Sequence, residues 1–332
     1  MEAGELLPSL RRAGRELVAW EFAFRGAGRI GLVAAAALLA ASGCAAQAKT
    51  TAKTKIPRAQ DCGGGVTLRL SSAGAAQGGL LEAELRSAAP VEGLKADWAG
   101  RDVPFWQDAR SKRVQRALLG VDLERAPGKY ELKLEAQLPS GGRLACSVAV
   151  EVRPGKFPVE KLTVAKEFIE PSQQDIERAE KESQRLHEIL AQVTPERLWR
   201  GCFRLPLYGA RNAKNFGRSR VLNGQPRSPH SGVDFPAPSG TPVHAAQSGR
   251  VVLAENLFFS GNTVVIDHGL GVYTFYAHME SLAVAAGDAV EKGALLGKVG
   301  ATGRVTGPHL HWGLTINQAR VNPMQILALP LN

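Results

Sequence analysis

Glycine and proline interrupt this chain so often that long helices can occupy little of it. The 332 residues include 36 glycines and 19 prolines, and both residue types disfavour the interior of helices. Between them lie short runs of alternating or continuous apolar residues, a pattern typical of β-strands. The sequence therefore predicts a mainly β protein that is long enough for two domains with buried cores.

Residues 63–156 contain the first series of predicted strands. Runs such as VTLRL, YELKLEAQL and CSVAVEV are separated by the turn signals AAQGG, APGK and PSGG. About seven such strands in roughly 100 residues indicate an immunoglobulin-like sandwich. The segment has no histidine and no recognisable catalytic motif, so we expect it to serve as a spacer or as a lid over its neighbour.

Residues 157–200 are predicted to be a connector with a helix at 172–192. Ser172 and Asp175 have the spacing of an N-terminal capping pair. The apolar residues of this helix fall on one stripe, which comprises Ile176, Ala179, Leu186, Ile189 and Leu190. Such a stripe indicates packing against a neighbouring domain, and docking of a regulatory protein is the alternative. From residue 201 to residue 329, frequent glycines and short strands predict a second all-β domain.

The first 43 residues are predicted to be a secretion signal. Two arginines precede the apolar stretch IGLVAAAALLAA, and small residues lead from it to Cys44. This ending resembles a lipoprotein signal, which implies a lipid anchor at Cys44, although Ala41 stands where such signals usually carry leucine. An ordinary cleaved signal is the alternative. Residues 44–62 would then form a flexible linker, and we expect an exported, periplasm-facing protein of the cell envelope.

Charge and cysteine content narrow the classes of partner. The net charge is +10, which suits an anionic polymer or membrane surface. The charge is spread along the chain without a nucleic-acid motif, so no nucleic-acid partner is expected. Export permits disulfides, and we expect Cys62 to pair with Cys146, which would leave Cys202 as the odd cysteine.

The histidines point to a metal site. Six of the seven lie between residues 230 and 311. His230 and Asp234 form an H-x-x-x-D pair, while His309 and His311 form an H-x-H pair whose members would face one side of a strand. A catalytic zinc takes three protein ligands and keeps one position open. His230, Asp234 and one histidine of the H-x-H pair supply three ligands, so the other histidine and His278 would lie beside the metal.

These motifs, in this order, resemble the lysostaphin and LytM-type zinc endopeptidases over residues 201–328. The surrounding segments SGVDFPAPSGTPVHA, YAHM and VGATGRVTGPHLHWG match as well. The resemblance implies a compact antiparallel β fold of the duplicated-hybrid-motif type with a groove for an extended peptide. It implies one Zn²⁺ per chain held by His230, Asp234 and His311, with His278 and His309 as catalytic histidines. The upstream domain is similar to the immunoglobulin-like domain that accompanies some of these enzymes.

The resemblance implies an endopeptidase that hydrolyses cross-links or stem peptides of bacterial peptidoglycan. Zinc would activate the attacking water and polarise the scissile carbonyl, and the two catalytic histidines would serve acid/base and oxyanion roles. The envelope location favours a cross-link of the D-alanyl–diaminopimelate type. His244 and His268 are predicted to be structural.

Two other functions stay open at this point. The first is a non-catalytic peptidoglycan-binding activator or scaffold of another wall hydrolase, acting with a regulatory protein partner, but the presence of all five motif residues argues against it. The second is a phosphocarrier-type domain, which the secretion signal and Asp234 oppose.

Overall fold

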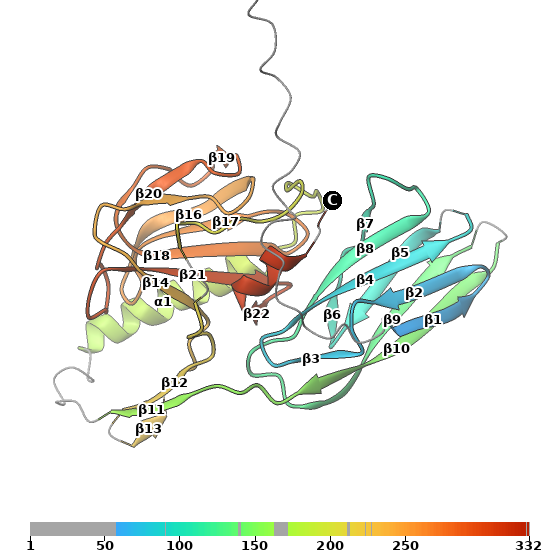
Figure 1. Cartoon of the computed structure of the whole chain (residues 1–332), viewed down its shortest axis with the longest axis horizontal. Coiled ribbons are helices and arrows are strands. Elements are labelled where there is room, and N and C mark those ends of the chain that lie inside the picture. The colour runs from blue at the N-terminus through green and yellow to red at the C-terminus, as the bar shows by residue number, and fades with distance from the viewer. Residues whose placement is uncertain are drawn as a thin grey trace, which may run out of the picture. The chain divides into compact units, whose positions relative to one another are not determined.

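The computed structural model shows a mainly β protein, as predicted, with one α-helix among the described residues (Figure 1). It describes residues 58–89, 91–138, 141–162, 172–210, 213–222, 224–226, 228–329 and 331. The predicted secretion signal and Cys44 lie outside these residues. Within the described residues, no helix is long and apolar enough to cross a membrane.

Two five-stranded sheets make up the N-terminal part of the described chain. The first sheet has the strand order β1 (Arg58–Gly63), β2 (Val66–Leu70), β4 (Leu80–Ser87), β8 (Val114–Gly120) and β7 (Trp106–Gln107). The second has the order β3 (Gly74–Ala76), β10 (Arg143–Arg153), β9 (Gly128–Gln137), β5 (Glu92–Trp98) and β6 (Arg101–Asp102). Alternate side chains of their strands are buried in one shared hydrophobic core. The immunoglobulin-like identity of this pair of sheets stays a prediction.

A disulfide joins the two sheets. Cys62 of β1 is bonded to Cys146 of β10 with an S–S distance of 2.00 Å, which confirms the expected pairing. The strand β1 begins at Arg58, within the range 44–62 predicted to be a linker, so the last five residues of that range belong to the sheet instead. The sequence did not predict this strand because its mostly polar residues do not alternate with apolar ones. Cys202 is also disulfide-bonded, so the expectation that it has no partner is wrong.

The predicted helix is present as α1 (Gln173–Ala191), with Ser172 as its N-cap. The Ser172 Oγ atom accepts a hydrogen bond from the Asp175 main-chain N–H at 3.2 Å. Only the C-terminal half of the predicted apolar stripe packs against the neighbouring domain, through Leu186, Ile189 and Leu190. Ile176, near the N-terminal end, is 37% exposed.

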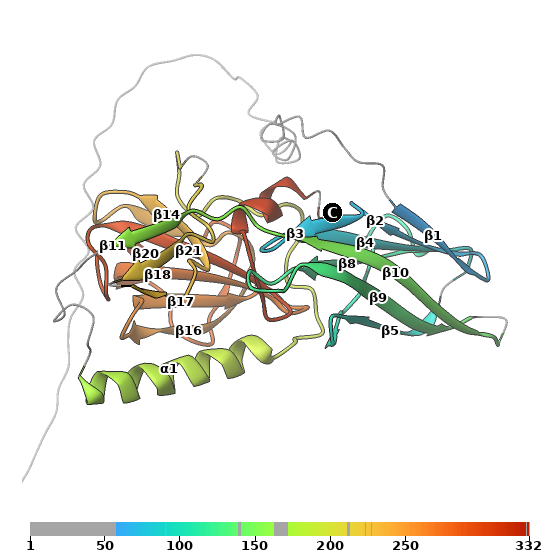
Figure 2. The same ribbon diagram turned by 90° about the horizontal axis from the view of Figure 1, so that it is seen from below.

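The C-terminal part is a nine-stranded antiparallel sheet with α1 alongside it (Figure 2). Its main path is β14 (Gly232–Pro236), β21 (His309–Ile316), β18 (Val272–Leu282), β17 (Gly261–Asp267), β16 (Gly249–Leu257) and β19 (Ala289–Val290). Three further strands complete it, namely β15 (Pro242–His244), β20 (Leu295–Val299) and β22 (Ala319–Val321), and a 3₁₀ turn, η2 (Pro323–Ala328), follows. A second hydrophobic core holds these strands together.

A small sheet ties the connector to the turn that precedes the site. The connector strand β11 (Val159–Leu162) pairs in parallel with β12 (Ser219–Leu222), which pairs with β13 (Gln225–Pro226). Next to it, the rings of Phe157 and Phe216 meet edge to face at 6.1 Å. The connector is therefore fixed to the segment just upstream of His230.

Candidate metal centre

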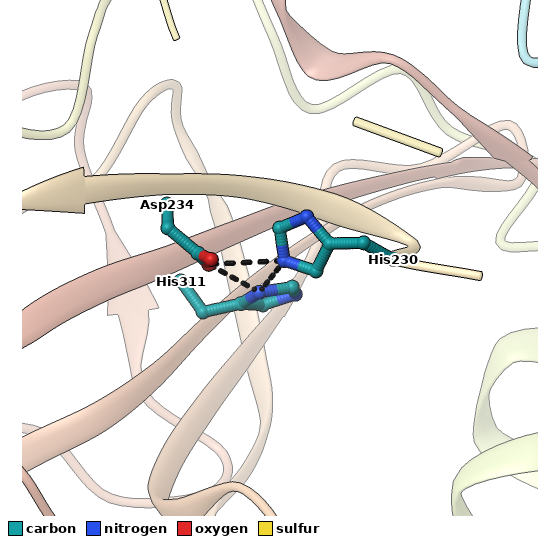
Figure 3. Close-up of side chains that lie close together, drawn as sticks. All are labelled: His230, Asp234 and His311. Atoms are coloured by element: carbon teal, nitrogen blue, oxygen red, sulfur yellow. Dashed lines mark hydrogen bonds and ion pairs between the residues drawn. The ribbon is translucent and has the colours of Figure 1, made fainter. Parts of the chain in front are cut away.

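The pairing of β14 with β21 brings Asp234 and His311 together. Asp234 is directly opposite His311 in the antiparallel pairing of these two strands. Residues directly opposite each other in such a pair have Cβ atoms about 4.5–5.5 Å apart, so the two side chains meet. His230 precedes β14 by two residues, and its ring lies over the start of the strand (Figure 3).

Gly232 makes room for this approach. A Cβ atom at position 232 would lie 2.6 Å from Nε2 of His311 and 2.5 Å from the main-chain oxygen of Trp312. Both distances are below any normal carbon contact. Glycine is therefore required where β14 passes the His311 ring, because any side chain would push that ring out of place.

Three ligand atoms form a nearly equilateral triangle (Figure 3). His230 Nε2 lies 2.9 Å from His311 Nδ1, and Asp234 Oδ1 lies 3.0 Å from each of these nitrogens. In a tetrahedral zinc site, ligand distances of roughly 2.0–2.2 Å put neighbouring ligand atoms about 3.3 Å apart. Two imidazoles and one carboxylate are also a donor set that transition metals such as zinc accept. The three residues therefore fit a metal ion, and the chain has a group that can bind one.

The electrostatics of Asp234 suit a metal ligand. Burial by itself raises the pKa of this carboxyl, but the hydrogen bonds and charges of His230 and His311 outweigh it and hold the pKa well below its usual range. The carboxylate is therefore ionised at neutral pH. Burial is the main cause that lowers the pKa of His311, which keeps its imidazole neutral and able to bind a cation.

His309 and His278 lie beside the triangle. His309 Nε2 is 3.8 Å from Asp234 Oδ1, farther than the two nitrogens of the triangle. The rings of His278 and His309 have centroids 4.8 Å apart. His278 comes from β18, the strand next to β21 on the other side from β14. The structure thus brings together all five residues that the motifs singled out.

Main-chain carbonyls set the tautomers of these two rings. His278 Nδ1 lies 3.0 Å from the Thr302 oxygen, and His309 Nδ1 lies 2.8 Å from the Gly307 oxygen. Because a carbonyl oxygen can only accept, Nδ1 of each histidine carries a proton, and in the neutral ring Nε2 is the atom that can act as a base. Burial, the largest cause, lowers the pKa of His278 to about 4, so its ring is neutral at neutral pH.

The backbone at His278 is strained. Its φ angle is +64°, in the left-handed region that residues other than glycine rarely adopt. The main-chain N–H of His278 donates to the Ser260 oxygen at 2.8 Å, which helps to hold that conformation. Strain of this kind gathers at functional sites because the surrounding structure is built to enforce it.

A groove of about 590 Å³ contains the five residues. One of its walls is α1, which contributes Ala179, Glu182, Ser183 and Leu186. The rest of its lining comes from the loops before β14 and β21 and from Leu257, Phe259 and Phe275. The groove thus combines the polar groups of the five residues with apolar side chains such as Leu257 and Phe275, a mixture that ligand-binding sites share.

The helix α1 is fixed to that wall by polar contacts. The Glu182 carboxylate accepts a hydrogen bond from the Phe258 main-chain N–H at 2.7 Å and pairs with Arg178 at 2.6 Å. Arg178 also donates to the main-chain oxygen of Asn256 at 3.1 Å. The helix is therefore held in place on β16 and on the loop that follows it.

The two histidines predicted to be structural stay out of the groove. His268 is fully buried and bonds the Ser248 oxygen and the Thr274 hydroxyl at 2.7 Å each. His244 packs edge to face on the ring of Tyr208, with ring centroids 4.7 Å apart. Neither residue lines the groove.

One residue in contact with the triangle was not predicted. Asn215 contacts both His230 and Asp234. A single asparagine in the segment AKNFG offers no spacing or residue-type signal for such a role, because its position depends on how the chain turns before β14.

The comparisons with known proteins agree with this geometry. The family model described as peptidase family M23 matches residues 228–323. Over 98 residues the chain is 45% identical to the peptidoglycan DD-endopeptidase ShyA of Vibrio cholerae. The aligned region covers 30% of this chain and 23% of that protein. Over 101 residues it is 46% identical to the DD-carboxypeptidase/endopeptidase Mpg of Neisseria meningitidis, again covering 30% of this chain and 23% of that protein. The chain thus spans about a quarter of the length of these curated relatives.

A solved structure is similar over a longer stretch. The crystal structure from Pseudomonas aeruginosa that is assigned to peptidase M23 has a TM-score of 0.59 and 29% identity. The likeness covers 76% of this chain and 96% of that one, so it extends well beyond residues 228–323. The H-x-x-x-D and H-x-H motifs, the antiparallel sheet that joins them and these matches lead to one conclusion: the chain contains a peptidase family M23 domain over residues 228–323.

Proposed function

We propose that this protein is a zinc-dependent endopeptidase that hydrolyses peptide cross-links of bacterial peptidoglycan. The observation that carries the proposal is the placement of two further histidine rings beside a His–Asp–His ligand triangle in one open groove. A metal-binding group alone would suit a structural site. Adjacent bases and an open groove are what hydrolysis additionally requires.

His230, Asp234 and His311 would hold the ion. A zinc ion bound there would polarise the scissile carbonyl and lower the pKa of its water. Because three protein ligands leave a tetrahedral ion with an open position, the site has the ligand count of catalytic rather than structural zinc.

His278 and His309 move protons and stabilise charge. In its neutral form each ring presents the lone pair of Nε2, since Nδ1 donates to a main-chain carbonyl. The ring that takes the proton of the attacking water on its Nε2 would then donate that proton to the leaving amine, and the other ring would stabilise the oxyanion through a protonated Nε2. The carbonyls of Thr302 and Gly307 keep both rings oriented while this occurs.

Peptidoglycan as substrate is supported by the names of the relatives. ShyA is named a peptidoglycan DD-endopeptidase, and Mpg is named a DD-carboxypeptidase/endopeptidase. The groove between α1 and the loops before β14 and β21 suits an extended peptide. A cross-link of the D-alanyl–diaminopimelate type is therefore the bond we propose. Export across the membrane would place the enzyme at this substrate.

The test is cleavage of purified cross-linked muropeptide dimers by the full chain. Mass spectrometry should show monomers whose new termini identify the D-alanyl bond. Intact dimers, with cleavage only of other peptides under the same conditions, would contradict the proposed substrate. The Asp234→Ala variant serves as the control because it removes the carboxylate of the ligand triangle.

A further inference from the structure

Asn215 makes three hydrogen bonds to two residues of the ligand triangle. Its side-chain Nδ2 donates to Asp234 Oδ2 at 3.0 Å, and its Oδ1 accepts from the Asp234 main-chain N–H at 3.1 Å. Its main-chain oxygen lies 2.9 Å from His230 Nδ1. It stands outside the segment 228–323 that matches the family.

The side-chain amide selects the oxygen that Asp234 offers. Since Nδ2 of Asn215 takes Oδ2, the other oxygen, Oδ1, is the one directed at His230 and His311. The second bond, from the Asp234 main-chain N–H, fixes the same residue at its backbone. Side chain and backbone are thereby held together, which limits rotation of the carboxylate away from the triangle.

The main-chain oxygen of Asn215 selects the tautomer of His230. A carbonyl oxygen accepts only, so His230 Nδ1 must carry the proton and Nε2 must present its lone pair. That Nε2 is the atom 2.9 Å from His311 Nδ1. Metal-binding histidines commonly donate their second ring N–H to such a partner, which sets both orientation and basicity.

The turn that carries Asn215 is itself anchored. Phe216 is 6% exposed and belongs to the C-terminal core. The main-chain N–H of Gly217 donates to the His230 oxygen at 2.8 Å, and the His230 N–H donates to the Arg218 oxygen at 2.9 Å. The position of Asn215 relative to His230 is therefore set by a two-way backbone pairing and a buried ring.

We propose that Asn215 is a positioning residue that preorganises His230 and Asp234 for metal binding. This inference rests on the proposed function, because it assumes that the triangle binds an ion. It adds a requirement outside the motifs: a chain with all three ligands but without Asn215 binds the ion weakly. Loss of partners of this kind lowers metal affinity by about 10- to 100-fold in other sites.

The test measures Zn²⁺ affinity directly, by competition of the metal-free full chain with a chromophoric chelator. Asn215→Ala removes both side-chain bonds to Asp234, and Asn215→Leu removes them while keeping a side chain of similar size. We expect both variants to bind Zn²⁺ about 10- to 100-fold more weakly than the unmodified chain. The main-chain bond to His230 survives in both, so binding should be weakened rather than abolished.

Asn322→Ala is the matched control. Asn322 caps η2 by accepting a hydrogen bond from the Met324 N–H at 3.0 Å, and it does not line the groove. We expect this variant to lose thermal stability without losing Zn²⁺ affinity. Asn215 variants that bind Zn²⁺ as tightly as the unmodified chain would overturn the positioning role while leaving the proposed function intact. Failure of the unmodified chain to bind Zn²⁺ would overturn both.

Discussion

Asp234 and His311 face each other across the β14–β21 pair, and their nearest side-chain atoms, Oδ1 and Nδ1, lie 3.0 Å apart. The ligand triangle therefore depends on strand register as well as on residue identity. A shift of one residue between these strands would turn one of the two side chains to the other face of the sheet. The close passage of β14 over the His311 ring is part of the same arrangement.

Enlarging Gly232 should disrupt this arrangement. In Gly232→Ala, the new methyl group would overlap the His311 ring and the Trp312 oxygen, so the ring must move away from Asp234. We expect weaker Zn²⁺ binding and lower activity, with destabilisation of about 1–3 kcal/mol from overpacking. Chelator competition and thermal unfolding of the metal-free chain measure the two effects. Unchanged Zn²⁺ affinity would show that the strand pair can adjust without moving His311.

Replacing either histidine beside the triangle should stop catalysis without removing the metal. His278→Ala and His309→Ala each delete an Nε2 base while leaving the three ligand residues in place. We expect kcat to fall about 10²- to 10⁴-fold, the usual contribution of acid–base catalysis. Metal analysis by mass spectrometry should still find one zinc ion per chain.

His244→Ala provides the comparison, because His244 packs on Tyr208 and does not line the groove. Its activity should match that of the unmodified chain. Full activity in His309→Ala or His278→Ala would contradict the catalytic roles. Loss of zinc from either variant would instead show that the ring is needed to hold the ion.

Narrowing the groove from the helix side should impair cleavage of the polymer. Ser183 lines the groove on α1, so Ser183→Trp would fill space that an extended peptide needs. We expect slower digestion of peptidoglycan at unchanged zinc content. Glu188→Trp is the control, since Glu188 is exposed on α1 and does not line the groove. Equal rates for the two tryptophan variants would show that substrate does not pass along α1.

The buried His268 should make stability depend on pH. Burial lowers its pKa to about 4 in the folded chain, below the ordinary value of 6.5. Between these pH values the unfolded chain binds a proton that the folded chain does not, so stability falls as pH falls. The full contribution is present above pH 6.5 and is lost at up to about 1.4 kcal/mol per pH unit as pH falls toward 4.

Urea unfolding of the metal-free chain at several pH values measures this dependence. His268→Gln keeps a hydrogen-bonding side chain but cannot take up the proton, so its stability should vary less between pH 6.5 and pH 4. Identical pH dependence in the variant and the unmodified chain would show that other groups cause the acid sensitivity.

The sequence predicts the β class and marks the five candidate site residues that the structure brings together, because both depend on local patterns. Two-residue periodicity puts His309 and His311 on one face of β21 whatever the rest of the fold does. Periodicity does not say which of them lies nearer Asp234. That depends on the register with β14, which pairs Asp234 with His311 and Pro236 with His309.

Other features depend on contacts between distant segments and leave no local signal. Asn215 reaches the triangle only because the turn at 215–218 pairs with the main chain of His230. The positive φ of His278 coincides with the irregular β17–β18 register between Asn262 and Val264 and cannot be seen in the segment YAHM. The strand β1 was predicted to be part of a linker because an edge strand with mostly polar side chains lacks the alternation of polar and apolar residues.

The most direct test of the central claim is digestion of purified peptidoglycan by the full chain in three states: metal-free, reloaded with Zn²⁺, and as the Asp234→Ala variant exposed to the same Zn²⁺. Mass spectrometry of the soluble products follows the cross-linked dimers. We predict that only the reloaded chain converts dimers to monomers, since it alone has both the ion and the complete ligand triangle. Equal cleavage by the metal-free chain or by Asp234→Ala would contradict a zinc-dependent endopeptidase.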